Sequence, residues 1–239
     1  MEMAKNMRTT TAPADGSAPA RHAAPAPFRG CETQISSFSP EKRVAALHFA
    51  ARIFGVPPCE FVPRVEVLYH LPKDVPLYRE YEGRDDPQQE FRLNGPVSWQ
   101  QSRVVYFNGW KLNPCENRRA SALVHEMAHI LTGVHAGMNG QVIRDRHAYM
   151  CATEGIATLS EIVRLRDLGG EWKGFPPGLP EEYHLGFGFF ASLCKLACGA
   201  GNAFRLVASN LPGSMEEIRH PELYLERATL AYATRRRVA

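Results

Sequence analysis

The chain has 239 residues, a formal net charge of +3 and 22% charged residues, which is an ordinary composition for a soluble globular protein. The small net charge argues against a nucleic-acid partner, and no apolar run reaches the roughly 18 residues that a membrane span requires. We therefore expect about 200 folded residues that share one sizeable core, as one domain or as two lobes.

The first 37 residues differ in composition from the rest of the chain. They are rich in alanine, proline and small polar residues, which cannot bury enough surface to offset the entropy of ordering. We predict a disordered or loosely attached tail over residues 1–37 and a folded domain over residues 38–239. The tail lacks the apolar segment of a secretory signal, and the six cysteines include no C-x-x-C pair. These features favour a reducing, cytoplasmic location, with organellar targeting by the tail as the alternative.

The first half of the folded part is predicted to contain one helix and a small sheet. Helical periodicity covers residues 39–54, where Ser39 and Pro40 open the segment and Gly55 closes it. The charged, turn-rich residues 76–87 are expected to form a loop. Strands are expected at residues 65–71, at 91–93 together with 97–101, and at 103–107.

His125-Glu126-x-x-His129 is the strongest chemical signal in the chain. Residues four apart lie on one face of a helix, so both imidazoles can point at one ion about 2 Å from each ring nitrogen. Glu126 is placed to reach a water molecule on that ion without being a ligand itself. The sequence therefore predicts a metal-binding helix. A buried helix with two hydrogen-bonded core histidines is the alternative.

Flanking residues predict where this helix begins and ends. Asn113, Pro114 and Glu116 resemble a capping box at its start, and Gly133 offers a stop. A Gly-rich connection follows, and further helices are predicted at residues 147–168, 181–211 and 214–235. The order of elements indicates an α+β chain, with an N-terminal lobe over about 38–135 and a mainly helical C-terminal lobe over about 136–239.

Two histidines do not complete a catalytic zinc site, which takes a third protein ligand and keeps one position open. Glu154 and His135 are the candidates for that ligand. Glu154 has apolar neighbours, and Gly155 beside it would let another helix approach closely. A carboxylate buried there would be costly without a cation, which favours Glu154 as the third ligand.

The two motifs together resemble the gluzincin branch of zinc metallopeptidases. They are His125-Glu126-x-x-His129 and Glu154-Gly155-x-Ala157-x-x-x-Glu161. The resemblance implies a zincin-like fold, in which a small mixed sheet packs on the metal-binding helix, and one zinc ion bound by His125, His129 and Glu154. Thr153 stands where the family commonly has asparagine.

The rival resemblance is to the metzincins, whose longer motif would make His135 the third ligand. In that motif a glycine precedes the final histidine by three positions and lets the chain leave the helix sharply. Thr132 occupies this position here, and threonine is poorly suited to positive φ.

The gluzincin resemblance implies peptide-bond hydrolysis by a zinc-activated water, with Glu126 as general base and then as proton donor to the leaving amine. The oxyanion needs a further donor, and relatives of this type use a tyrosine or histidine from the helical lobe. His220 and Tyr224 are favoured for this role over the other candidates, which are Tyr149, Tyr183 and His184. Glu161 or Thr158 is expected to orient a ligand histidine, and an extended substrate to pair with residues 103–107.

We therefore expect an active zinc metallopeptidase whose partner is a peptide or protein substrate, with neither a nucleic-acid nor a membrane partner. A catalytically restricted zincin-like module, which senses or regulates through its bound metal, is the alternative. Glu126 argues against this alternative, because a pure binding module has no use for a base beside the metal. A metal-free structural domain is the third possibility.

Overall fold

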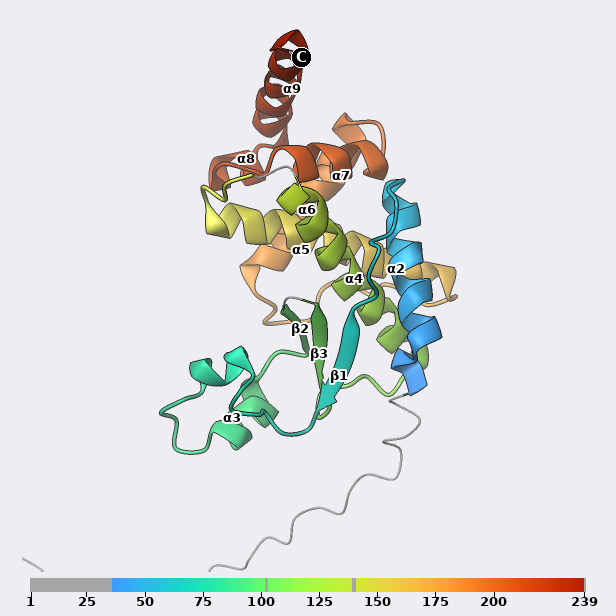
Figure 1. Ribbon diagram of the computed structural model, residues 1–239, viewed down its shortest axis with the longest axis vertical. Helices are drawn as coiled ribbons and strands as arrows, with labels where there is room; N and C mark the ends of the chain where they lie inside the picture. Colours follow the sequence, from blue (N-terminus) through green and yellow to red (C-terminus); the bar gives the residue numbers. More distant parts are fainter. Residues whose placement is uncertain (1–35, 102, 139–140, 239) are drawn as a thin grey trace, which may run out of the picture.

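The computed structural model describes residues 36–101, 103–138 and 141–238, which form a mostly helical α+β fold with a small mixed sheet (Figure 1). In chain order the elements are η1 (Ser36–Phe38), α2 (Pro40–Phe54), β1 (Arg64–Leu68), η2 (Pro76–Glu80), α3 (Pro87–Asn94), β2 (Ser98–Gln101), β3 (Val104–Asn108), α4 (Glu116–Met138), α5 (Arg146–Asp167), α6 (Glu181–Leu196), α7 (Ala200–Ser209), α8 (Met215–Arg219) and α9 (Pro221–Val238). The predicted α+β class is confirmed.

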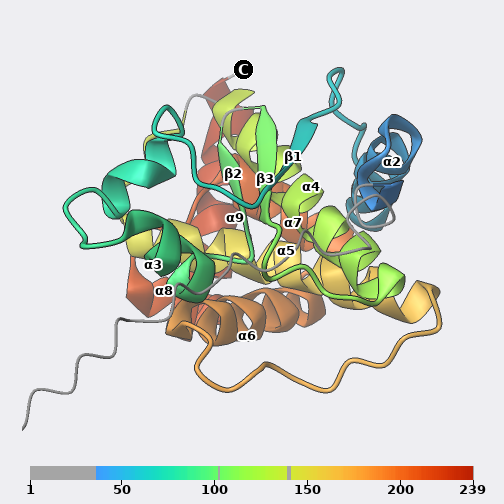
Figure 2. The same ribbon diagram turned by 90° about the horizontal axis from the view of Figure 1, so that it is seen from below.

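The sheet has the strand order β1-β3-β2, so β3 is its centre and β2 one of its edges. β1 runs parallel to β3 with Val65 opposite Val105, and β2 runs antiparallel to β3 with Trp99 opposite Tyr106. Between β1 and β2 the chain forms η2 and α3 over a small separate core that includes Phe91. Figure 2 shows α3 and α2 on opposite sides of the sheet. An extended substrate was expected to pair with residues 103–107, and this prediction is wrong because β3 is already paired on both sides.

Helices α4, α5 and α6 form the body of the molecule, and β2 packs on α4. The contact between α5 and α6 is very close where Gly155 faces Gly186. A Cβ at position 155 would lie 2.0 Å from the Gly186 carbonyl oxygen, and a Cβ at position 186 would lie 2.0 Å from the Cys151 carbonyl oxygen. Real Cβ atoms do not approach this closely, so only glycine fits on either side. The expectation that Gly155 admits a neighbouring helix is confirmed.

The segment before α2 is anchored to the start of α4. Ser37 and Phe38 are buried, Arg119 Nε donates to Ser37 Oγ at 2.8 Å, and the Phe38 and Phe107 rings stack with centroids 4.5 Å apart. Ser37, one residue before the predicted boundary at residue 38, is therefore already part of the packed domain. The rest of the predicted tail, residues 1–35, lies outside the described part of the chain.

Two helix limits in the first half differ from those predicted. Residues 87–94 form α3 where a strand was predicted at 91–93, because Asp86 Oδ1 accepts from the backbone N–H groups of Gln88 and Gln89 and thereby caps the first turn. α4 continues through Gly133 to Met138, so the predicted stop at Gly133 is wrong. Gly133 has no positive φ and simply continues the helix.

The two long helices predicted at the C-terminal end each divide in two. α6 and α7 are separated where Cys198 and Gly199 adopt positive φ angles of 56° and 132°, which a helix cannot accommodate. α8 and α9 are separated at His220. Among the described residues, no single helix is long and apolar enough to cross a membrane, and only α6 and α7 taken together, bent by 113°, meet that length and composition.

Candidate metal centre

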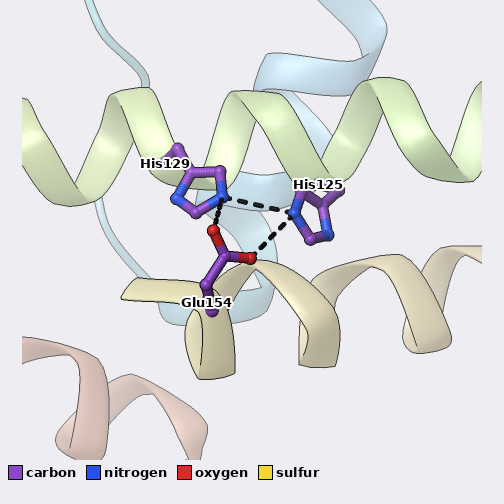
Figure 3. A group of neighbouring side chains, drawn as sticks. All are labelled: His125, His129 and Glu154. Carbon is purple, nitrogen blue, oxygen red and sulfur yellow. Dashed lines mark hydrogen bonds and ion pairs between the residues drawn. The ribbon is translucent and has the colours of Figure 1, made fainter. Parts of the chain in front are cut away.

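His125 and His129 lie on successive turns of α4, and their rings point to the same side of the helix (Figure 3). His125 is buried and His129 is half-buried. Their Nε2 atoms lie 3.2 Å apart. The lone pairs of two ring nitrogens at this distance repel one another unless a proton or a cation lies between them. The helical spacing of the motif thus brings two potential ligand atoms to one point.

Glu154 reaches this point from α5, which packs beside α4 (Figure 3). Its Oε2 lies 3.4 Å from His125 Nε2, and its Oε1 lies 3.4 Å from His129 Nε2. Two ligand atoms about 2.05 Å from a tetrahedral zinc ion lie about 3.3 Å apart. The three side chains therefore have nearly the separations that a shared zinc ion requires. Within the described part of the chain they form a group that can hold a metal.

The buried carboxylate supports the same interpretation. Glu154 Oε2 is buried and accepts no hydrogen bond from the described residues, since His125 Nε2 at 3.4 Å is too distant for a good one. A buried carboxylate oxygen without a partner is costly, whereas a cation at the common point would satisfy it. Two imidazole nitrogens and one carboxylate oxygen are also a known donor set for catalytic zinc. The residues present fit a zinc ion.

The charges of the group are complementary. Burial raises the pKa of Glu154, but the two neighbouring imidazoles, His129 and His125, outweigh it and hold the pKa well below the usual range. Burial lowers the pKa of His125, but the neighbouring carboxylates of Glu154 and Glu161 outweigh it and raise the pKa well above the usual value. Positive charge at this point, as a proton or as a cation, is therefore strongly favoured.

Glu161 contacts His125 on the side of the ring opposite Glu154, in the position expected of a residue that orients a ligand histidine. His125 Nδ1 lies 3.1 Å from Glu161 Oε2, and because a carboxylate only accepts, the Nδ1–H group donates. When the imidazole is neutral, as a metal ligand must be, this hydrogen bond fixes the tautomer that leaves a lone pair on Nε2, on the side of Glu154 and His129. Thr158, the other residue expected to orient a ligand, has a buried hydroxyl with no hydrogen-bond partner among the described residues.

Glu126 belongs to the same cleft but not to the three-residue group. It is buried, and its Oε1 accepts a hydrogen bond of 2.6 Å from Ser98 Oγ on β2. The cleft has a volume of about 380 Å³ and is lined by Ser98, Trp99, Gln100, His125, Glu126, His129, Gly133, Tyr149, Thr153, Glu154 and Tyr183. Sequence reasoning missed Ser98, because its partner is 28 residues away along the chain and no local pattern signals the contact.

Tyr183, at the start of α6, lines the cleft and lies beside His125. Its ring lies nearly parallel to that of His125, with centroids 6.3 Å apart and an interplanar angle of 24°. Burial raises its pKa, and the nearby charges of Glu154, Glu126 and Glu161 raise it further. Tyr149 on α5 also lines the cleft. Both were weaker candidates than His220 and Tyr224 in the sequence.

The structure places His220 and Tyr224 away from the cleft, so their predicted catalytic roles are wrong. His220 lies between α8 and α9, is exposed, and forms an ion pair with Glu222 at 3.2 Å. Tyr224 is fully buried, and its hydroxyl donates to the Asn210 carbonyl oxygen at 2.9 Å while its ring packs edge-on against Phe189. Tyr224 is a core residue whose hydroxyl is already used.

We expect Tyr224→Phe to lower the free energy of unfolding by about 1 kcal/mol, because one buried hydrogen bond is lost while the ring packing is kept. Any peptide cleavage by the native chain should be retained by the variant. Thermal unfolding and a peptide-cleavage assay on the same preparation test this. A large loss of activity at unchanged stability would return Tyr224 to the catalytic residues.

His135 does not join the group either. α4 continues past it, and its ring lies edge-on to Phe204 of α7 with centroids 5.6 Å apart. Six residues along a continuous helix place it on a different face from His129. The sharp turn that the metzincin alternative requires after His129 is absent from the described residues, so the geometry favours Glu154 over His135 as the third member of the group.

Comparisons with protein-family models, with curated proteins and with solved structures give no match for this chain. The chemistry of the cleft is therefore inferred from its own residues.

Proposed function

We propose that this chain is a zincin-like, zinc-dependent metallopeptidase that hydrolyses peptide bonds. The observation that carries the proposal is the meeting of His125, His129 and Glu154 at separations of 3.2 to 3.4 Å. These separations match those of ligands around tetrahedral zinc, and Glu126 lines the same cleft as a potential base. The order of the two motifs along the chain supports a gluzincin type.

His125, His129 and Glu154 would hold the zinc ion, and Glu161 would orient His125. When bound, the ion supplies a Lewis acid that polarises the scissile carbonyl and makes water acidic near neutral pH. Glu126 takes a proton from the attacking water and passes it to the leaving amine. Ser98 keeps the Glu126 carboxylate pointing into the cleft, and Tyr183 donates its hydroxyl hydrogen to the developing oxyanion.

The edge strand β2 provides a wall along which a peptide can lie. Ser98, Trp99 and Gln100 of this strand line the cleft beside Glu126. An extended peptide added to a sheet edge gains main-chain hydrogen bonds and presents alternate side chains to the same face. We therefore place the substrate along β2, which replaces residues 103–107 in this role.

The proposal is tested by comparing the native chain with Glu126→Gln, loaded with zinc, against a peptide library. We expect both proteins to contain one zinc ion, because Glu126 is not a ligand. The native chain should cleave peptides about 10²–10⁴ times faster than the variant, which lacks the base. Metal analysis and mass spectrometry of the products give the two readouts. Zinc binding without any cleavage by the native chain would favour the sensor or regulatory module, and absence of zinc would leave a structural domain.

A further inference from the structure

A second cavity lies away from the metal cleft, beside the start of α4 and the end of α5. Residues of α2, the first turns of α4 and the last turn of α5 enclose it, and its volume is about 150 Å³. It shares no lining residue with the metal cleft. A ligand held there would therefore be independent of the proposed function.

The wall of this cavity is largely apolar because small side chains meet between the helices. Ala45 and Ala46 of α2 and Ala120 of α4 leave space that larger side chains would fill. Leu123 and Leu168 complete the apolar wall. An apolar cavity of about 150 Å³ is large enough to bind benzene. The space therefore fits one aromatic ring or one short branched alkyl chain.

Arg164 supplies the cavity with a polar group that is already held in place. Its side chain is 26% exposed, its guanidinium carbon lies 4.7 Å from the centroid of the Phe49 ring, and its Nη1 donates to Asp167 at 2.6 Å. Its Nε and Nη2 groups donate to no acceptor among the described residues. The other two charged residues of the wall, Lys42 and Glu116, pair with one another at 2.6 Å. A guanidinium with unused donors beside an apolar space favours a carboxylate.

We propose that this cavity is a binding site for a small carboxylate whose apolar part is a single aromatic ring or a short branched alkyl chain. The apolar part lies against the three alanines, and the carboxylate accepts hydrogen bonds from Arg164. An amine of the same shape is excluded by the positive charge of Arg164, and a neutral alcohol forms weaker hydrogen bonds with it.

The first test is calorimetric titration of the full chain with benzoate. Benzyl alcohol, benzylamine and acetate are the matched compounds, since they lack the charge, reverse it and lack the ring. We expect a single benzoate to bind at least about tenfold more tightly than each of the other three. Absence of benzoate binding overturns the site. Equal affinity for benzoate and benzyl alcohol overturns the role of Arg164.

Two substitutions locate the bound benzoate. Ala45 is exposed and lines the cavity, so Ala45→Leu fills the space without entering the core, whereas Val44→Leu enlarges an exposed neighbour that does not line it. Ala45→Leu should weaken benzoate binding more than about tenfold, and Val44→Leu should leave it unchanged. Arg164→Gln should lower the affinity for benzoate to that for benzyl alcohol. Arg166→Gln, which removes an exposed guanidinium outside the cavity, should not.

Glu154→Ala separates this site from the metal group, because a carboxylate can also bind a metal ion. Benzoate affinity should be the same in the native chain and in Glu154→Ala. Binding that is lost in Glu154→Ala but kept in Ala45→Leu would place the benzoate on the metal and overturn the inference, while leaving the proposed metal centre standing. Thermal unfolding of each variant shows that it is folded, and if Arg164→Gln unfolds, the comparison of Ala45→Leu with Val44→Leu decides.

Discussion

Glu154→Ala should abolish stoichiometric zinc binding. Glu154 supplies the carboxylate that lies 3.4 Å from each ligand nitrogen, and alanine leaves the two histidines without a third protein ligand. Loss of an outer partner of a ligand typically costs 10–100-fold in metal affinity, so loss of a ligand should cost more than about 100-fold. The purified variant should contain little zinc, and competition with a chelator should give the ratio of affinities. The proposed peptidase activity should fall with the metal content.

Two further variants serve as references for the zinc affinity of Glu154→Ala. His135→Ala should retain native zinc content, because His135 packs against Phe204 and lies outside the group. Glu161→Gln should weaken zinc binding only about 10–100-fold, because it touches His125 rather than the ion. If His135→Ala lost its zinc while Glu154→Ala kept it, the metzincin alternative would be right and the proposed ligand set wrong.

The Gly155→Ala substitution should be among the most destabilising single-methyl additions in the chain. Its new Cβ would lie 2.0 Å from the Gly186 carbonyl oxygen and 2.5 Å from the Gly186 carbonyl carbon, so α5 and α6 must move apart. We expect the free energy of unfolding to fall by about 3 kcal/mol, the upper range for an overpacked core. The melting temperature should drop by about 6–12 °C. Zinc affinity should fall as well, because Glu154 is the preceding residue on α5.

Gly188→Ala is the matched control for this effect. It lies on α6 two residues after Gly186, is exposed, and has no described atom within 4 Å of its would-be Cβ. The same added methyl group should leave stability unchanged or raise it slightly, because alanine favours a helix. Equal stability of the two alanine variants by thermal unfolding would contradict the close helix contact as the element that holds Glu154 in place.

The parts of the site that depend on local spacing could be predicted from the sequence. His125 and His129 share a helix face whatever surrounds them, and Gly155 carried a signal of close helix packing beside Glu154. The tyrosine at the cleft could not be chosen in this way. Tyr183 and Tyr224 both follow helical patterns, and only the packing of α6 against α5 and of α9 against α6 decides which one reaches the cleft and which one is buried in the core.

In the fold, too, the elements with clear local signals could be predicted from the sequence. The strands at residues 98–101 and 104–108 and the helix at 40–54 follow from periodicity and end signals. α3 was missed because an Asp-Pro pair such as Asp86-Pro87 is as typical of a turn as of a helix start. The hydrogen bonds from the backbone N–H groups of Gln88 and Gln89 to Asp86 identify the helix cap. The break between α6 and α7 was missed because Cys198 is not a residue that usually adopts positive φ.

The hydrogen bond between Ser98 and Glu126 has a consequence for inhibitors. A serine hydroxyl has a single proton to give, so Ser98 cannot serve Glu126 and a second acceptor at the same time. A compound whose carbonyl oxygen accepted the Ser98 hydrogen bond would take it away from Glu126. The Glu126 carboxylate would then be free to change its side-chain rotamer. Such a compound would displace the proposed base from the strand side of the cleft without contacting either imidazole or a metal ion bound between them.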